Sequence, residues 1–390
     1  MPPKAHAKLS PSSAHRWMNC PPSVNLEAGF PDRTTTFAEE GTLAHKLAEL
    51  TLRYGFEEIH KRTYTIRLNK LKEDPLFNKE MSDYIDLYAV LVNEQFSEVK
   101  ASCPDAQIFF EQQFDLSAYI PGGFGTGDVV IIADDLMQVI DLKYGKGVGV
   151  SAVENPQLRI YALGALMEYS MLYDIQRVKT TIIQPRLDNV SSEELSVADL
   201  LAWGKDVLRP AAKLAEAGEG EFKVGEHCRF CKAFATCRAQ KDYQLELAKY
   251  DFADAPLLDD NEIGDVLTRV DALVKWAEAV KDYAYKEAVH GSKQWPGWKL
   301  VEGRSTRKYV DEDAVAEKLL KSGWEEVVIY KPRELQGITA MEKILGKKGF
   351  AELLGGLVIK PEGKPVLVPE SDKRPALDLA EHVKDEFKDI

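Results

Sequence analysis

The sequence predicts an α/β protein in which a mixed central sheet is flanked by helices. Three observations support this fold class: residues 34–55 and 79–100 carry apolar side chains at helical spacing, three β-type runs follow, and a helix and another β-run come next. The three runs are QIFFEQQFDL, GTGDVVIIAD and MQVIDLKYGKG. We expect these elements to form the domain that carries the functional site.

The two N-terminal helices are indicated by the spacing of their apolar residues. In TTTFAEEGTLAHKLAELTLRYG the apolar positions that recur with the helical period are Phe37, Leu43, Leu47, Leu50 and Leu52. The segment KEMSDYIDLYAVLVNEQFSEVK has the same kind of pattern. Each helix is therefore expected to bury one face.

Turn residues divide the β-runs. Pro/Gly and Asp-Asp pairs separate them, which predicts a three-stranded meander. The helix NPQLRIYALGALMEYS then begins with Asn155 as its N-cap and Pro156 in its first turn, and VKTTIIQPRL is predicted to be another strand.

The remainder of the chain is predicted to be helical and mixed. Residues 197–217 and 257–290 have helical patterns, whereas 296–390 combine short strands, Gly turns and a Lys/Glu-rich tail. A chain of 390 residues exceeds what one core usually organises. We predict a first domain at 1–245 and a second region at 255–390 whose role the sequence does not indicate.

Composition limits the function classes. The net charge of -13 counts against a protein that coats DNA and requires any positive groove to be local. The start MPPKAHAKLS lacks a secretory signal and no apolar run is long enough to span a membrane, so we expect a cytoplasmic protein without a membrane partner. Five cysteines in so long a chain favour metal binding or redox chemistry over a disulfide framework.

The meander carries a candidate metal site. Asp128 begins one β-run and Asp141 lies in the next, so they could face each other across a hairpin and share Mg²⁺ or Mn²⁺. Lys143 lies two residues after Asp141 and therefore on the same strand face, and the Leu142 carbonyl is a further candidate ligand. Such a cation would neutralise phosphoryl charge and activate a water.

Two upstream residues could complete this site. His45 lies in the first helix and Glu111 in the first β-run, where each could contribute a ligand. The competing interpretation is that the acids and Lys143 are solvated surface partners and His45 is an ordinary packed residue. Asp-x-Lys alone has little specificity, and the preceding Gly-x-x-Asp run and the following helix with Gln157 and Tyr161 strengthen it.

Four segments together resemble, in order, the motifs of RecB-like nucleases of the PD-(D/E)XK, or restriction-endonuclease-like, superfamily. They are GTLAHKLAE, GTGDVVII, VIDLKYGKG and NPQLRIYALG. The resemblance implies the α/β core of that superfamily. It also implies that His45, Asp128, Asp141 and the Leu142 carbonyl are metal ligands and that Lys143 is catalytic, with Glu111 as an accessory acid. Gln157 and Tyr161 would position DNA.

The remaining cysteines suggest a second metal site. Cys228, Cys231 and Cys237 give three thiolates in one short loop, and a four-ligand site needs one more, for which Cys20 is the candidate and Cys103 the alternative. A Cys₄ zinc site is the competing assignment, although zinc sites usually draw on two C-x-x-C pairs. The arrangement of one distant cysteine and a C-x2-C-x5-C resembles the iron–sulfur clamp of AddB and the CRISPR-adaptation nucleases, which implies a [4Fe–4S] cluster on Cys20, Cys228, Cys231 and Cys237.

These resemblances imply a deoxyribonuclease, with exonucleolytic or single-strand cutting expected over sequence-specific cutting. The alternative is a non-cleaving DNA-binding or recombinase-partner protein that keeps the fold and the cluster. No G-x-x-x-x-G-K-[ST] loop for ATP is present, so an ATPase activity would belong to a partner such as a helicase. Further expected partners are a recombinase, a single-strand-binding protein or a second copy of the chain. The string SPSSAHRWMNCP resembles an uncharacterised phage and prophage family.

Overall fold

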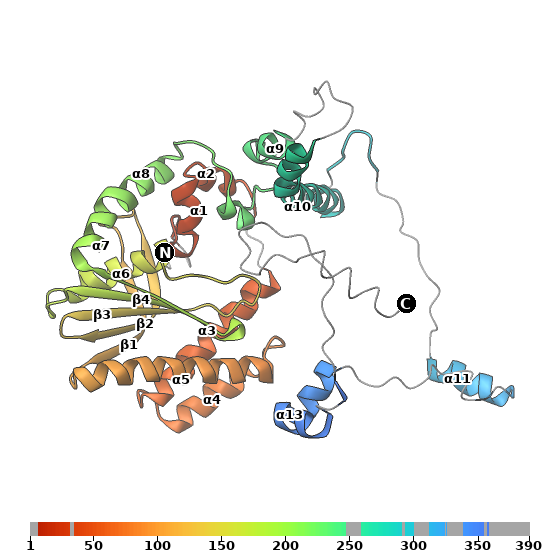
Figure 1. Ribbon diagram of the computed structural model, residues 1–390, viewed down its shortest axis with the longest axis horizontal. Coiled ribbons are helices and arrows are strands. Elements are labelled where there is room, and N and C mark those ends of the chain that lie inside the picture. The colour runs from red at the N-terminus through yellow and green to blue at the C-terminus, as the bar shows by residue number, and fades with distance from the viewer. Residues whose placement is uncertain are drawn as a thin grey trace, which may run out of the picture. The chain divides into compact units, whose positions relative to one another are not determined.

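Residues 7–31, 35–246, 259–290, 293–299, 312–323, 325, 338–354 and 357–358 are described by the computed structural model (Figure 1). The N-terminal helices are α1 (Ala14–Asn19), α2 (Ser23–Ala28), α3 (Thr36–Gly55), α4 (Lys61–Leu71) and α5 (Lys79–Ser102). The strands are β1 (Gln107–Asp115), β2 (Phe124–Ala133), β3 (Leu136–Leu142), β4 (Arg177–Gln184) and β5 (Asn189–Ser196), and α6 (Pro156–Tyr169) joins β3 to β4. After β5 come α7 (Val197–Trp203), a π-helical turn (Gly204–Leu208), α8 (Arg209–Ala217), α9 (Arg238–Gln244), α10 (Asp260–His290), α11 (Glu312–Lys321) and α13 (Ile338–Leu354).

The strands form one five-stranded mixed sheet in the order β1-β2-β3-β4-β5. β1, β2 and β3 are the predicted antiparallel meander, β4 runs parallel to β3, and β5 is antiparallel to β4. The parallel pair requires a crossover, which α6 provides. The mixed α/β fold with flanking helices is therefore confirmed, and β5 is a strand that the sequence analysis did not predict.

Each face of the sheet packs against its own helices because successive strand residues point to opposite faces. Val129 and Ile140 belong to the apolar cluster of α3 and α5, whereas their neighbours Val130 and Val139 belong to the cluster of α6. Figure 1 shows α3, α4 and α5 on one side of the sheet and α6, α7 and α8 on the other. The sheet is thus the middle of three layers.

The crossover helix lies very close to the sheet. Asn155 caps α6 by accepting from the backbone N–H groups of Gln157 and Leu158, as its sequence predicted. A Cβ on Gly164 would lie 2.6 Å from the Cβ of Phe114, so glycine is needed for this approach. This contact sets how closely α6 approaches β1, the strand that carries Phe114.

The N-terminal segment packs against α6 and α8. Trp17 of α1 is buried in the same apolar cluster as Leu163 of α6 and Ala212 of α8, and its indole N–H donates to the Ser10 carbonyl at 3.0 Å. Helix α1 is therefore fixed beside the segment that follows β5.

Some helix predictions need correction. Phe37 was assigned to the buried face of α3 but is 82% exposed, whereas Leu43, Leu47, Leu50 and Leu52 are buried as predicted. The helix begins at Thr36 with Thr35 as its cap, and its first buried residue is Leu43, so its first two turns bury no side chain. The sequence analysis also did not predict α4, which buries no residue.

The chain divides into two units, residues 1–285 and 286–390. The predicted domain boundary between 245 and 255 lies largely outside the described residues, as do most of the strands expected within 296–390. The described parts of that region contain the helices α11 and α13. Among the helices that the structure describes, none has the length and apolarity needed to cross a membrane.

Candidate functional site

The β2–β3 hairpin places the two predicted aspartates beside each other. The register pairs Val129 with Ile140, so Asp128 and Asp141 occupy the next pair of positions along the two strands. The backbone N–H of Leu142 donates to Asp128 Oδ2 at 2.7 Å. Asp141 is only 3% exposed, so this is a buried carboxylate and not the solvated surface acid of the competing interpretation.

His45 and Glu111 converge on Asp128. His45 Nδ1 lies 3.2 Å from Asp128 Oδ1, and one ligand atom each of His45, Glu111 and Asp128 lie within 4.8 Å of one another. The β1–β2 register places Glu111 opposite Asp128. Within the described part of the chain, these three side chains are a group whose spacing fits one metal ion.

The backbone at Glu111 is strained. Its φ of 51° lies in the left-handed region, inside a strand and in a residue that is not glycine. Such a conformation costs about 1 kcal/mol or more and marks sites where the surroundings impose it. The strained residue is thus the one that β1 contributes to the group with His45 and Asp128.

The protonation of this group follows from burial and mutual charge. Asp128 raises the pKa of His45 to about 9, against the opposing effect of burial. Burial, with the charge of Asp128, raises the pKa of Glu111 to about 7. Burial opposes ionisation of Asp128, but His45 and the Leu142 N–H outweigh it and lower the pKa of Asp128. The raised pKa values of His45 and Glu111 therefore favour their protonated forms, whereas the lowered pKa of Asp128 favours its ionised form.

The second half of the site is a polar network around Asp141, whose buried Oδ2 has an ion-pair contact with Lys143 but no hydrogen-bond partner. Lys143 Nζ lies 2.9 Å from Asp141 Oδ2 and 2.7 Å from the side-chain oxygen of Gln157, to which it donates. The Gln157 amide in turn donates to Asp141 Oδ1 at 3.0 Å and to the Tyr161 hydroxyl at 3.4 Å. Lys143, Gln157 and Tyr161 therefore lie with the carboxylates, as their sequence positions predicted.

One neighbouring residue was predicted only as an apolar helix position. Tyr88 of α5 is fully buried and its hydroxyl has no hydrogen-bond partner. Burial raises its pKa, and the charges of Asp128, Asp141 and Glu111 raise it further. The sequence contains no motif that would have identified it.

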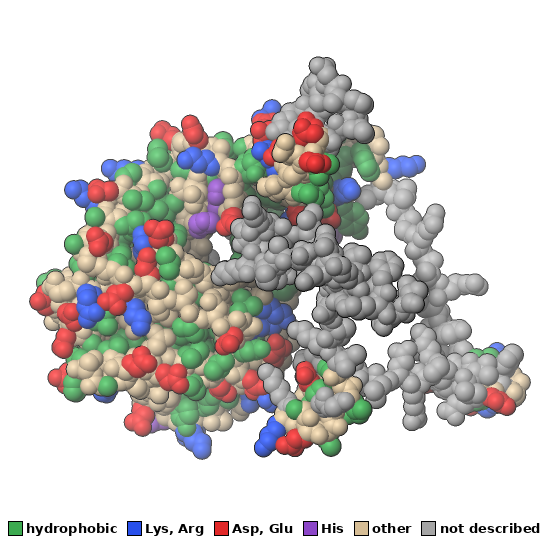
Figure 2. All heavy atoms as spheres, in the orientation of Figure 1, with side chains coloured by type: hydrophobic (Ala, Val, Ile, Leu, Met, Phe, Trp, Pro, Cys, Tyr) green, Lys and Arg blue, Asp and Glu red, His purple; other side chains and the backbone are tan. Residues whose placement is uncertain are grey.

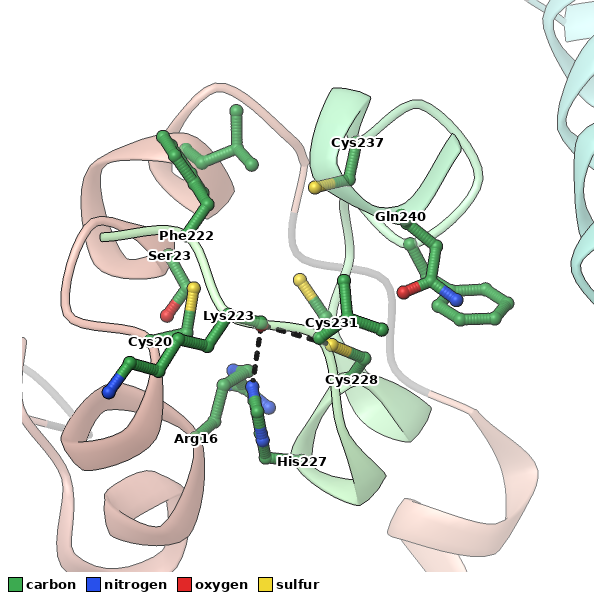
Figure 3. Close-up of a pocket in the computed structure, with 13 residues that line it drawn as sticks. Arg16, Cys20, Ser23, Phe222, Lys223, His227, Cys228, Cys231, Cys237 and Gln240 are labelled. Carbon is green, nitrogen blue, oxygen red and sulfur yellow. Dashed lines mark hydrogen bonds between the residues drawn. The ribbon is translucent and has the colours of Figure 1, made fainter. Parts of the chain in front are cut away.

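The four predicted cysteine ligands line a single pocket. Cys20 follows α1, while Cys228, Cys231 and Cys237 lie in the segment 225–237, which we call the cysteine loop. Figure 3 shows their sulfur atoms facing the space between the N-terminal helices and this loop. Cys103 does not line this pocket; it caps the C-terminal end of α5 and is buried in the other apolar cluster. The geometry therefore distinguishes Cys20 from the alternative that the sequence left open.

Polar atoms in the pocket also lack partners. Ser23 Oγ and Gln240 Oε1 are buried, line the pocket and make no hydrogen bond. Burial raises the pKa of the Cys231 thiol to about 12, and a hydrogen bond with Cys20 raises the pKa of His227. A buried thiol with such a pKa is neutral at pH 7 unless a cation binds it.

A family model described as a protein of unknown function, DUF2800, matches residues 6–375. The chain therefore belongs to the DUF2800 family. A solved structure titled "Crystal structure of SSO0001" is similar at 14% identity over 58% of this chain and 96% of its own, with a TM-score of 0.24. A similarity at that level says nothing about function.

Proposed function

We propose that the chain is a metal-dependent deoxyribonuclease of the RecB-like group in the PD-(D/E)XK superfamily. The observation that carries the proposal is the convergence of His45 and Glu111 on Asp128, directly beside the Asp141–Lys143 pair. Carboxylate oxygens and an imidazole fit Mn²⁺, and Mg²⁺ is compatible through the carboxylates. The residues come from three strands and one helix, which gives them fixed positions.

The residues of the candidate site would have different roles in catalysis. Asp128, Asp141, His45 and the Leu142 carbonyl would hold the cation, with Glu111 as a further acid; a bound Mg²⁺ or Mn²⁺ supplies charge neutralisation and a more acidic water. Lys143 would direct its ammonium at the scissile phosphate or at the attacking water. Gln157, which contacts Asp141, and Tyr161, which contacts Gln157, would orient Lys143 and contact the DNA strand.

The charge distribution favours a local contact with DNA. On the face in Figure 2, acidic and basic side chains of the described residues are interspersed and form no broad basic surface. A protein with a net charge of -13 would gain little from binding long duplex non-specifically. End-directed or single-strand cleavage agrees with this distribution better than tight coating of DNA.

We propose a [4Fe–4S] cluster as the cofactor of the cysteine pocket. Thiolates around zinc lie about 3.8 Å apart, as follows from Zn–S bonds of about 2.3 Å in a tetrahedron. Among the described residues, no three cysteines have sulfur atoms that all lie within 4.8 Å of one another, so the sulfur positions do not match this tetrahedral spacing. Ser23 would donate its unpartnered hydroxyl to a sulfur of the cluster.

The test is an assay with end-labelled single- and double-stranded DNA and Mg²⁺ or Mn²⁺. Asp141→Ala and Asp141→Asn should each reduce cleavage by several orders of magnitude while the circular dichroism spectrum stays native. Asp135→Ala is the matched control, because Asp135 lies at the turn of the same hairpin, is exposed and pairs with Arg177. Undiminished cleavage by both Asp141 variants would refute the assignment. DNA binding by the wild type without cleavage would favour the non-cleaving alternative.

A further inference from the structure

A single carboxylate connects the two segments that carry the cysteines. Glu27 of α2 is only 9% exposed. Its Oε2 accepts from Arg16 Nε at 2.7 Å, and its Oε1 accepts from the backbone N–H of Lys232 at 2.7 Å. Arg16 lies one helical turn before Cys20, and Lys232 directly follows Cys231.

Arg16 makes a second contact with the same loop. Its Nη1 donates to the Phe230 carbonyl at 3.2 Å, so the backbone on both sides of Cys231 is fixed by the Arg16–Glu27 pair. Arg16 also lines the cysteine pocket (Figure 3). None of these contacts requires a metal.

The cysteine loop also contacts the N-terminal segment through His227, which hydrogen-bonds Cys20 and lies edge-on to the ring of His15, but few residues of the loop are buried. Between residues 225 and 237, Ala233 is the one fully buried residue, and the regular structure there is a short 3₁₀ helix at Glu226–Phe230. Buried apolar area normally fixes a segment, and little is available here. Charge-assisted hydrogen bonds are stronger than neutral ones, so the two ends of Glu27 supply much of what positions the loop.

We propose that Arg16 and Glu27 form a metal-independent latch that holds the cysteine loop against Cys20, so that the four thiols form a ligand cage before any cofactor binds. The proposal rests on the cofactor proposed above. It assigns Glu27 as a positioning residue, because the carboxylate acts through Lys232 and Arg16 and not on the cofactor. Loss of the latch should leave the ligands present but no longer preorganised.

The test uses Glu27→Gln, which keeps the shape of the side chain and removes its charge. The matched control is Glu193→Gln, because Glu193 forms a similarly buried pair with Arg159 at 2.6 Å and neither residue lines the cysteine pocket. Full-length proteins are prepared anaerobically, and iron content, visible absorbance and the rate of iron release to a chelator are measured. Outer-shell partners of metal sites typically change metal affinity by about 10- to 100-fold, so Glu27→Gln should release iron faster by that order.

A second measurement separates a latch from general destabilisation. In metal-free protein, labelling of the cysteines by a thiol reagent should be faster in Glu27→Gln than in the wild type, whereas Glu193→Gln should label at the wild-type rate even where its melting temperature falls. Equal labelling and equal iron release in Glu27→Gln and wild type would overturn the latch. Wild-type protein without iron would refute the cofactor instead, and the labelling rates would then decide the latch alone.

Discussion

The imidazole of His45 lies 3.2 Å from the carboxylate of Asp128, which joins helix α3 to strand β2 at the centre of the candidate metal site. The pair accounts for the raised pKa of His45, about 9, and for the lowered pKa of Asp128. A metal ion bound at the proposed site would have to displace the proton that this pair shares. Proton and cation therefore compete for one position.

The first prediction follows from that competition. His45 has a higher pKa in the folded protein, about 9, than its usual value of 6.5, so its protonation stabilises the folded state. In metal-free protein this stabilisation should be complete below about pH 6.5 and lost as the pH rises to about 9. Glu111, with its pKa raised to about 7, gives the same sign between about 4.5 and 7. Mn²⁺ affinity should change in the opposite direction: it should rise by up to about tenfold per pH unit between about 7 and 9, where His45 releases a proton, and more steeply below about 7, where Glu111 also does.

Calorimetric titrations with Mn²⁺ across pH 6 to 9 would measure this dependence. His45→Gln should weaken binding and remove the part of the pH dependence above about 7, leaving the part that Glu111 contributes. Affinity that is independent of pH in the wild type would contradict the assignment of His45 as a ligand.

The second prediction concerns Gln157, which contacts both Asp141 and Lys143. Gln157→Ala should lower kcat about 10- to 100-fold with a smaller change in KM, because both partners lose their fixed positions. A rise in KM with unchanged kcat would instead show that Gln157 acts mainly by contacting DNA, which is the role that the family resemblance implies. Gln176→Ala is the control, because its amide bonds an exposed aspartate at the start of β4 and lies outside the network.

The sheet that carries the site was predictable because its motif residues lie on adjacent β-runs with clear turns. β5 was not, because NVSSEELS alternates between exposed and half-buried positions and contains few apolar residues. For the same reason α4, which buries no residue, left no apolar pattern to read. Elements at the edge of a fold leave a weak signal in the sequence.

The residues of the candidate metal site could be predicted from the sequence more fully than the contacts around the cysteine loop. Asp128, Asp141 and Lys143 were identified from local spacing, because a hairpin determines which residues face each other. The central place of Glu111 depends on its left-handed backbone, which its sequence neighbours do not indicate. The contact of Glu27 with Lys232 joins residues 205 positions apart and follows only from the packing of α2 beside the cysteine loop.

The third prediction compares two buried cysteines. Cys20 is 6% exposed and Cys103 is 8% exposed, so their burial is matched, but only Cys20 lines the cysteine pocket. Cys20→Ala should remove the brown absorbance and lower the melting temperature, because metal binding at a site that exists only in the folded chain stabilises the fold. Cys103→Ala should change neither by much.

The reverse pattern would show that Cys103 is the fourth ligand, and stoichiometric zinc without iron would show a different metal. Both measurements require anaerobic preparation, because exposed iron–sulfur clusters are lost by oxidation. The Cys20 variant also removes the hydrogen bond that raises the pKa of His227, so His227→Ala serves as a control for that contact.

The fourth prediction separates the strain at Glu111 from its carboxylate. Glu111→Ala removes the carboxylate and keeps a side chain at a φ of 51°, whereas Glu111→Gly removes both the carboxylate and the strain. In metal-free protein the Gly variant should be more stable than the Ala variant by about 1 kcal/mol, since glycine adopts this region without penalty. Both variants should bind Mn²⁺ more weakly than the wild type, and to the same extent, because the lost ligand is the same.

Denaturant unfolding and Mn²⁺ titration measure the two effects. A Gly variant less stable than the Ala variant would show that the strand does not hold Glu111 in a strained conformation, and unchanged Mn²⁺ affinity in both would remove Glu111 from the metal site.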